Sequence, residues 1–306
     1  MKSKRRLFSP LLCHLLLAAL IVLLFLPGQK QTHGPAAMLV AVLLIEGLYL
    51  LRIFRKREDL QSASDILLIV WSFLLLWELL VTKLNRLHPV LVPAPENVFH
   101  VFAEEPLFIL KGVRSSLTLF LASLAIGIAL GMFAGLVCGW IPRLRKVFHP
   151  IANVLAPIPS IVFAPYIISL APSFRAASAI VLILGIFWPT FLNMIIRVDG
   201  IDKGILNTAR SMGLTNAQMI FQVLLPYAFA GVISSLKVTL TTGIMMLTFA
   251  EMMGSTSGMG YYIVNYNTYG NYTKVVAGII VVGIVVTVLN KLVNLLQSKL
   301  IRWQMY

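Results

Sequence analysis

The sequence predicts an all-α protein that crosses a membrane many times. Of its 306 residues, 59% are hydrophobic and only 12% are charged, and the mean hydropathy is +0.90. A soluble domain of this composition would lack the polar residues that cover a folded surface. The chain also repeats apolar segments of about 17–25 residues, the length that crosses a hydrocarbon layer roughly 30 Å thick. Together these observations indicate a polytopic membrane protein.

Eight apolar segments have this length. The formal net charge of +14 is explained by the tendency of Lys and Arg to stay in the cytoplasm, since no soluble basic segment is present that could bind nucleic acid. With both termini in the cytoplasm, seventeen Lys and Arg residues fall inside and seven outside, so we expect this orientation. The expected spans are 8–27, 36–53, 65–84, 115–140, 147–170, 176–198, 227–250 and 275–298.

The N-terminal part reads as a separate hairpin of two spans. The charged linker 52–65 follows it, so we expect a division into 1–60, the hairpin with its linker, and 61–306. The basic start of the first span is compatible with a cleaved signal peptide. However, the apolar run is longer than is usual for such a peptide, and 26–28 (Leu-Pro-Gly) offers no small-x-small cleavage site. We therefore expect the first span to be retained.

No motif for covalent or nucleotide chemistry is present in the sequence. It contains no G-x-x-x-x-G-K-[ST] phosphate loop, no H-E-x-x-H and no G-x-S-x-G. Cys13 and Cys138 lie far apart in apolar segments and are expected to act as small hydrophobic residues. We therefore expect no enzyme activity, no metal site and no cofactor bound by this chain.

A polar stretch between two apolar spans, residues 203–226, predicts a short helical hairpin on the cytoplasmic side. Gly213 stands where a first helix needs a left-handed C-terminal cap, and Thr215 with Gln218 forms a capping-box pattern for a second helix. Pro226 is expected to break the chain before the next apolar run. Such a hairpin suits docking to another protein, and the alternative is an ordinary polar loop.

Two patterns concern the packing of the spans. Gly127, Gly131 and Gly135 recur every four residues and form a stripe against which another helix can pack closely. The span 147–170 contains prolines that remove backbone donors, and broken backbone at membrane depth is tolerated only against protein or a water-lined cavity. This span is therefore expected beside the transport pathway, the alternative being a merely kinked helix. Its prolines are Pro150, Pro157, Pro159 and Pro165.

Charged side chains inside spans are the next candidates, because each costs about 2.5–3.5 kcal/mol at a helix centre. Glu46 is expected to make a structural hydrogen bond, with contact to a substrate as the alternative. Lys237 can extend toward the cytoplasm. Glu251 begins an external loop and is expected at the membrane interface. It lies roughly 21 Å along the helix from Lys237, too far for the two to pair.

The polar hairpin resembles the EAA loop of permease subunits of ATP-binding-cassette (ABC) importers, whose pattern is Glu-Ala-Ala, three residues, Gly, nine residues, Ile, one residue, Leu-Pro. This chain keeps the spacing, but Asn207 and Thr208 stand where the pattern has Glu and the first Ala. The absent Glu leaves no acid there for an ion pair with the ATPase, although Asn207 can form a hydrogen bond. The residues that this resemblance implies for coupling to the ATPase are Asn207, Thr208, Ala209, Arg210, Gly213, Leu214, Val223, Leu225 and Pro226.

Further landmarks resemble the nitrate, sulfonate and taurine permease branch, in order along 65–306. They are Val92-Pro93-Ala94-Pro95-Glu96, Ser115-Ser116-Leu117 before the glycine stripe, the prolines, and Ala250-Glu251 followed by Gly258-Met259-Gly260. The first two spans lie outside the resemblance.

The resemblance implies a type I (MetI-like) importer permease of about six helices, with the N-terminal hairpin as an addition. Two copies would form the pore in the bacterial cytoplasmic membrane, and a separate ATPase dimer would bind ATP and Mg²⁺. An extracytoplasmic binding protein would deliver a small solute, such as a sulfonate or nitrate-like anion, to loops near 86–112 and 252–273. The pathway residues expected are Pro157, Pro159, Pro165 and Glu251.

Two other classes remain as alternatives. A secondary transporter driven by an ion gradient would use Glu46, Glu78 and Glu251 as ion sites, and it predicts inverted repeats, which the sequence does not display. A membrane scaffold without transport predicts no broken, proline-rich span.

Overall fold

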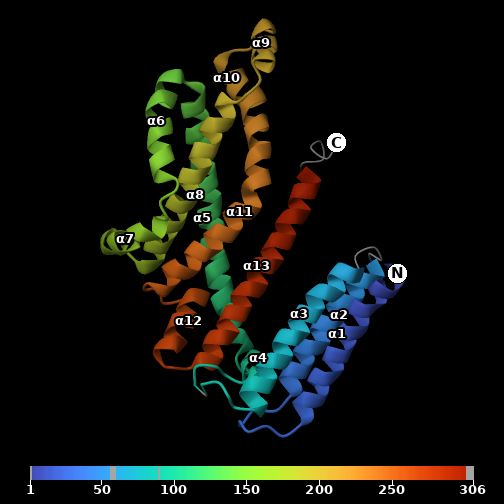
Figure 1. Cartoon of the computed structure of the whole chain (residues 1–306). Coiled ribbons are helices and arrows are strands. Elements are labelled where there is room, and N and C mark those ends of the chain that lie inside the picture. The colour runs from blue at the N-terminus through green and yellow to red at the C-terminus, as the bar shows by residue number, and fades with distance from the viewer. Residues whose placement is uncertain (1, 56–59, 89, 301–306) are drawn as a thin grey trace. The chain divides into compact units, whose positions relative to one another are not determined.

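The computed structural model describes residues 2–55, 60–88 and 90–300, and every regular element within these ranges is a helix. The chain divides into two compact units. The first contains residues 1–110 and 263–280, and the second contains residues 111–262 and 281–306. Figure 1 shows the course of the chain; each unit is described by itself.

Among the described residues, six helical segments are long and apolar enough to cross a membrane. A bent pair, Pro142–Leu155 with Ser160–Leu170, would make a seventh, and Ser9–Phe25 is a shorter apolar helix. The eight expected segments therefore all correspond to apolar helical structure, although the span 147–170 is not one helix. The six segments are Ala36–Phe54, Leu60–Lys83, Pro106–Trp140, Phe174–Asp199, Asn216–Met252 and Tyr272–Lys299.

The first unit is built around α1 (Lys2–Phe25), α2 (Ala36–Arg55) and α3 (Leu60–Trp77). α1 packs along α3, and the three helices share one apolar core that includes Cys13, Val42 and Trp71. A buried hydrogen bond of 2.8 Å joins the hydroxyls of Tyr49 on α2 and Ser64 on α3. The two N-terminal spans thus share their core with α3 rather than closing on each other as a separate hairpin. The division at residue 60 remains a prediction about domains.

A buried polar cluster follows α3, in the π-helical turn η2 (Glu78–Lys83) and the first turn of α4 (Pro95–Glu104). Nζ of Lys83 lies 3.0 Å from Oε1 of Glu78. The Thr82 hydroxyl lies 3.2 Å from Glu78 Oε2 and 3.0 Å from Glu96 Oε2. Burial lowers the pKa of Lys30, which lies in the connector before α2, while the Glu96 carboxylate acts in the opposite direction. In this structure Glu78 is therefore an ion-pair partner within the first unit.

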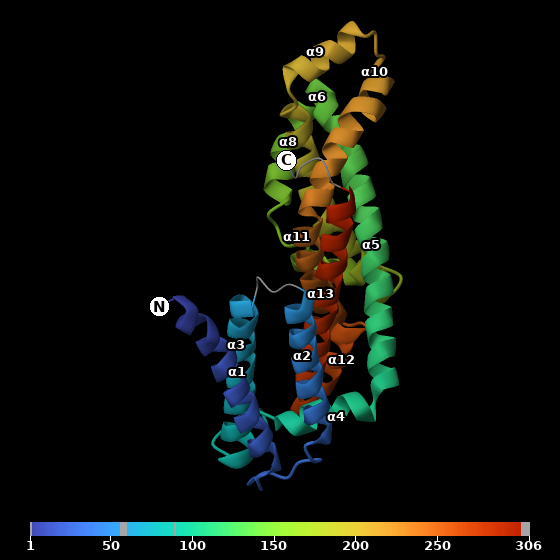
Figure 2. The same cartoon turned by 90° about the vertical axis from the view of Figure 1, so that its right-hand side faces the viewer.

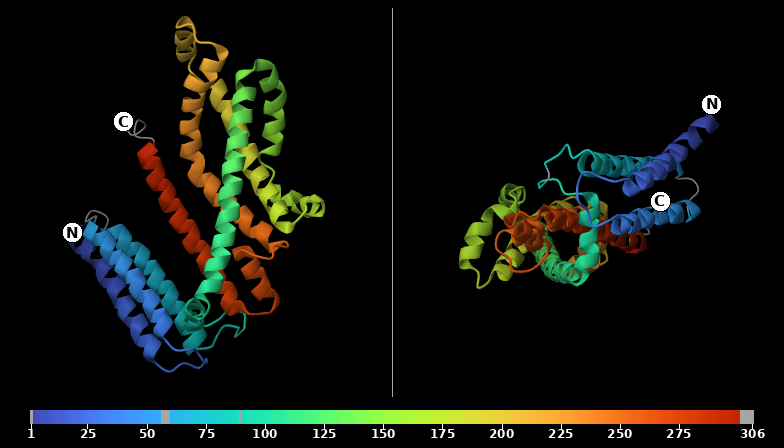
Figure 3. Two further views of the ribbon diagram at one scale, coloured as in Figure 1. Left: turned by 180° about the vertical axis from the view of Figure 1, so that it is seen from behind. Right: turned by 90° about the horizontal axis from the view of Figure 1, so that it is seen from below.

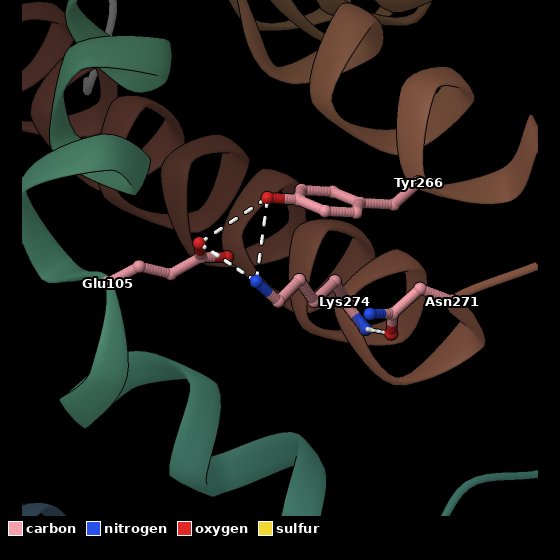
Figure 4. Close-up of polar contacts among 4 residues, drawn as sticks. All are labelled: Glu105, Tyr266, Asn271 and Lys274. Atoms are coloured by element: carbon pink, nitrogen blue, oxygen red, sulfur yellow. Dashed lines mark hydrogen bonds and ion pairs between the residues drawn. The ribbon is translucent and has the colours of Figure 1, made fainter. Parts of the chain in front are cut away.

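A second polar contact in this unit joins residues far apart in the sequence. Nζ of Lys274, in the first turn of α13 (Tyr272–Leu300), lies 3.1 Å from Oε2 of Glu105. The Tyr266 hydroxyl, on α12 (Met259–Thr268), donates to the same oxygen at 3.4 Å. The Lys274 backbone N–H donates to Oδ1 of Asn271 at 3.2 Å, as Figure 4 shows. The contact fastens the beginning of α13 to the residue that precedes α5 (Pro106–Trp140).

The second unit packs α8 (Phe174–Asp199) against α11 (Leu225–Met252) and against the part of α5 that begins at Leu119. The glycine stripe of α5 makes the approach to α8 possible. A Cβ on Gly127 would lie 2.9 Å from Cβ of Ile186, and a Cβ on Gly135 would lie 2.6 Å from Cβ of Met194. Helix packing is therefore the role of this stripe. α6 (Pro142–Leu155) runs back beside the end of α5, as the left view in Figure 3 shows.

Candidate functional site

The first helix of the polar hairpin, α9 (Lys203–Ser211), has the C-terminal glycine cap that the sequence predicts, and an N-terminal cap that was not predicted. The side chain of Asp202 caps its N-terminus by accepting from the Gly204 N–H. At the other end Gly213 has φ of +76°, the left-handed conformation, and its N–H donates to the Arg210 carbonyl at 2.9 Å. The glycine therefore reverses the chain after a single short helix.

The second helix begins at α10 (Asn216–Gln218) with a complete capping box. The Gln218 N–H donates to the Thr215 hydroxyl at 3.4 Å, and the Thr215 N–H donates to Oε1 of Gln218 at 2.9 Å. The expected helical conformation of the hairpin is confirmed, and the alternative of an ordinary polar loop is wrong; its place on the cytoplasmic side stays a prediction. Figure 2 shows α9 and α10 at the end of the second unit where α8 ends and α11 begins.

The expected break at Pro226 is wrong. The helix runs without interruption from Asn216 to Met252, through the π-helical turn η4 (Met219–Leu224) into α11. Pro226 lies in the first turn of α11. There the hydrogen-bond register changes from the wider π-turn to the α-helix, so a residue without an N–H is accommodated.

One face of the hairpin packs on the body of its own unit. Ala209 is buried, as are Met219 and Leu224, in a core that also contains Leu136 and Met194. Of the other residues expected to couple, the half-buried ones are Leu214, Val223 and Leu225, and the exposed ones are Asn207, Thr208, Arg210, Gly213 and Pro226.

The exposed face of the hairpin carries apolar side chains that the motif did not identify. Met212 is 74% exposed, Phe221 59% and Ile205 47%. Exposed apolar side chains on a short hairpin are typical of a surface that docks to another protein. The sequence contains these apolar residues within a polar stretch, but only the fold shows that their side chains are exposed.

The proline-rich span is broken rather than kinked. Between α6 and the following pair η3 (Ser160–Phe163) and α7 (Ala164–Leu170), the helix axis bends by 83°. Pro157 and Pro159 lie in this bend. Pro150 lies inside α6, and Pro165 occupies the first turn of α7, where no helical donor is lost. The expectation that each proline would remove a helical donor is therefore wrong for Pro165.

Two adjoining hollows run between α8 and α11, and we call them together the α8–α11 groove. Pro157 and Pro159 line the larger hollow, of about 280 Å³. The smaller, of about 160 Å³, adjoins it at Pro189 and Thr239, which line both. Pro165 and Glu251 line neither hollow. The polar residues that line one or both hollows are Thr190, Asn193, Ser235, Thr239 and Thr242.

Glu251 is buried within the protein and lies in the last turn of α11, not in a loop as expected; its position at the membrane interface stays a prediction. α11 extends to Met252, and Glu251 is only 2% exposed. The Ser116 hydroxyl lies 2.7 and 2.9 Å from its two carboxylate oxygens, and the Gly260 N–H donates to Oε2 at 2.8 Å. The Met259 N–H donates to the Ser116 hydroxyl at 2.8 Å. The carboxylate thus fixes the segment after α11, and its role in a pathway stays a prediction.

The remaining charged residues within spans have separate surroundings. In the first unit, Glu46 Oε1 lies 3.3 Å from Nε2 of His14, an ion-pair contact when the imidazole is protonated; the structural hydrogen bond expected for Glu46 stays a prediction. In the second unit, Lys237 is exposed on α11 and does not line the groove. No group of three or more His, Cys, Asp or Glu that could hold a metal ion occurs in the described part of the chain.

The helical fold is MetI-like. A chain of the MetNI methionine ABC transporter, solved in inward-facing conformations, matches with a TM-score of 0.53 at 20% identity, over 63% of this chain and 96% of that one. The chain belongs to the family described as the binding-protein-dependent transport system inner membrane component, which matches residues 127–304. It is thus a multi-pass permease of an ABC importer.

Named relatives fall in the branch expected from the landmarks. SsuC of Bacillus subtilis, named an aliphatic sulfonates transport permease protein, is 29% identical over 235 residues, covering 75% of this chain and 83% of its own. The taurine transport system permease protein TauC of Escherichia coli is 25% identical over 247 residues, covering 78% and 86%. The nitrate import permease protein NrtB of Leptolyngbya laminosa is 26% identical over 182 residues, covering 60% and 64%.

Proposed function

We propose that this chain forms the translocation pathway for a small anion, of the sulfonate or nitrate kind, in an ATP-driven importer of the bacterial cytoplasmic membrane. The observation that carries the proposal is the capped helical hairpin α9–α10 between two membrane helices. The permease performs no covalent step and binds no cofactor. The relatives named for sulfonates, taurine and nitrate support the choice of cargo.

The hairpin is the point at which a cytoplasmic ATPase dimer, which binds ATP and Mg²⁺, acts on this chain. Its buried face, which includes Ala209, is fixed to the ends of α8 and α11, so a displacement of the hairpin is passed to both helices. Its exposed face, with Met212 and Phe221, supplies apolar area for a groove on the ATPase. Closure of the ATPase dimer then drives alternating access.

Two copies of the chain surround the pathway, and an extracytoplasmic binding protein delivers the anion to the outer loops near 86–112 and 252–273. Both termini lie in the cytoplasm, in agreement with the excess of Lys and Arg on that side. The polar lining of the α8–α11 groove supports a place for the anion between these two helices.

The test is uptake of labelled taurine, an alkanesulfonate or nitrate in the native host after deletion of the gene. We expect loss of uptake of one of these anions, restored by the wild-type chain but not by Gly213→Pro at equal abundance in the membrane. Uptake that persists when ATP is depleted, or that stops when an ionophore collapses the ion gradients while ATP is maintained, would instead identify a secondary transporter.

A further inference from the structure

We propose that the α8–α11 groove contains a binding site for the transported anion, in which Arg197 supplies the positive charge. The inference rests on the proposed function for the identity of the cargo, and it assigns to named side chains the contacts that select an anion.

The guanidinium of Arg197 lies across the neighbouring helix. Arg197 is in the last turn of α8, and a Cβ added to Gly231 of α11 would overlap its Cζ, Nε and Nη1 atoms. The side chain is half-buried, and among the described residues no carboxylate forms an ion pair with it. A guanidinium held against a helix loses part of its hydration, and a bound anion compensates for that loss.

Asn193 connects this charge to the groove. Nε of Arg197 donates to Oδ1 of Asn193 at 3.2 Å. Because a guanidinium can only donate, Oδ1 is fixed as the acceptor, and the Asn193 amide retains its two N–H donors. Asn193 also lines the smaller hollow, so these donors belong to a residue of the groove wall.

The polar residues continue from Arg197 along both helices. Pro189, Asn193 and Arg197 recur every four residues on α8 and therefore share one face. On α11, Ser235, Thr239 and Thr242 recur at intervals of four and three and likewise share one face. Pro189 and Asn193 line the hollows opposite the row on α11, whereas Arg197 lines neither hollow and lies one turn beyond Asn193. The Ser235, Thr239 and Thr242 hydroxyls donate to carbonyls of their own helix, so the donors that an anion would meet first are those of the Asn193 amide, with the Arg197 cation beyond them.

The lining of the two hollows carries no charge of its own. Among the described residues that line them, none is acidic and none is basic, so the charge that favours an anion is that of Arg197, which is bonded to Asn193. A planar guanidinium matches two oxygens of a sulfonate or nitrate at once, which an ammonium does not.

The site is tested without the ATPase or the binding protein, by the reactivity of a cysteine in the groove. In a full-length chain in which Cys13 and Cys138 are replaced by Ala, Thr239→Cys is treated in membrane vesicles with two methanethiosulfonates. One carries a sulfonate and the other a trimethylammonium group. We expect the sulfonate reagent to react faster, and Arg197→Gln to shift the ratio of the two rates by about tenfold toward the cationic reagent.

Three matched variants distinguish the site from a general effect of charge. Gly231→Ala keeps the arginine but removes the space for its guanidinium, and we expect it to shift the ratio in the same direction as Arg197→Gln. Arg143→Gln removes an exposed cation of α6 outside the groove, and we expect it to leave the ratio unchanged. Arg197→Lys keeps the charge and should preserve most of the preference.

A ratio that is the same with and without the Arg197 charge overturns the proposal, and so does a Thr239→Cys thiol that neither reagent reaches. Because the measurement involves no transport, a failure of ATP-driven uptake would count against the proposed function and leave the anion site standing. Conversely, if uptake is normal but the Thr239→Cys thiol does not prefer the sulfonate reagent, the anion site is wrong and the proposed function still holds.

Discussion

The Ser116 hydroxyl and the Glu251 carboxylate, 135 residues apart, form one buried contact with distances of 2.7 and 2.9 Å. The contact joins α5 to the end of α11, and the Met259 and Gly260 N–H groups complete it. Polar groups this deeply buried are costly when they lose their partners.

Ser116→Ala is therefore expected to destabilise the second unit by about 1–3 kcal/mol, because the Met259 N–H loses its acceptor and Glu251 loses a donor. The measurement is thermal unfolding of the purified permease in detergent. Ser298→Ala is the matched control, since Ser298 is exposed on α13. Equal melting temperatures for the two variants would contradict a structural role for Ser116.

Gly135→Ala and Gly283→Ala should change stability in opposite directions. A Cβ at Gly135 would lie 2.6 Å from Met194 Cβ and 2.7 Å from the Phe191 carbonyl oxygen, whereas at Gly283 nothing lies within 4 Å. Overpacking at Gly135 should cost about 1–3 kcal/mol, while Gly283→Ala gains helix propensity alone. Thermal unfolding of both variants tests this, and a Gly135→Ala protein as stable as wild type would show that α5 and α8 do not pack this closely.

Gly213 is required for its backbone conformation and not for its size. Its φ is +76°, and a Cβ there would meet nothing within 4 Å. Gly213→Val should strain the turn by about 1–2 kcal/mol, whereas Gly213→Asn should be tolerated because Asn adopts this conformation more readily. We expect uptake to fall in the Val variant and to be largely retained in the Asn variant, at equal membrane abundance. Equal uptake by the two variants would show that coupling does not require the left-handed turn at Gly213.

Glu105→Gln should weaken the first unit. Lys274 is bound by the Glu105 carboxylate at 3.1 Å, and both side chains are less than one-fifth exposed, at 19% and 17%. Loss of the negative charge should cost about 1–3 kcal/mol, and the double variant Glu105→Gln with Lys274→Gln should recover part of it. Urea or thermal unfolding of the single and double variants measures the coupling. Strict additivity would mean that the pair contributes no interaction energy.

Much of the fold and part of the site could be predicted because their signals are local. Hydropathy located the spans, since backbone groups in lipid must be satisfied within a helix. Gly213 and the Thr215–Gln218 box defined the hairpin, since caps depend on residues only a few positions apart. Pro226 was misjudged because a preceding π-turn accommodates it, and propensity alone does not reveal such a change of register.

The sequence by itself determined that this protein is a membrane permease with a helical hairpin, because hydrophobic period, capping residues and motif spacing are properties of neighbouring positions. Only the tertiary structure decided that Glu251 is buried against Ser116, that α1 packs along α3, and that Arg197 lies over Gly231 beside a hydroxyl-lined groove. These relationships join residues far apart in the chain. Their existence depends on which helix faces meet, and that choice is made by packing rather than by any local pattern.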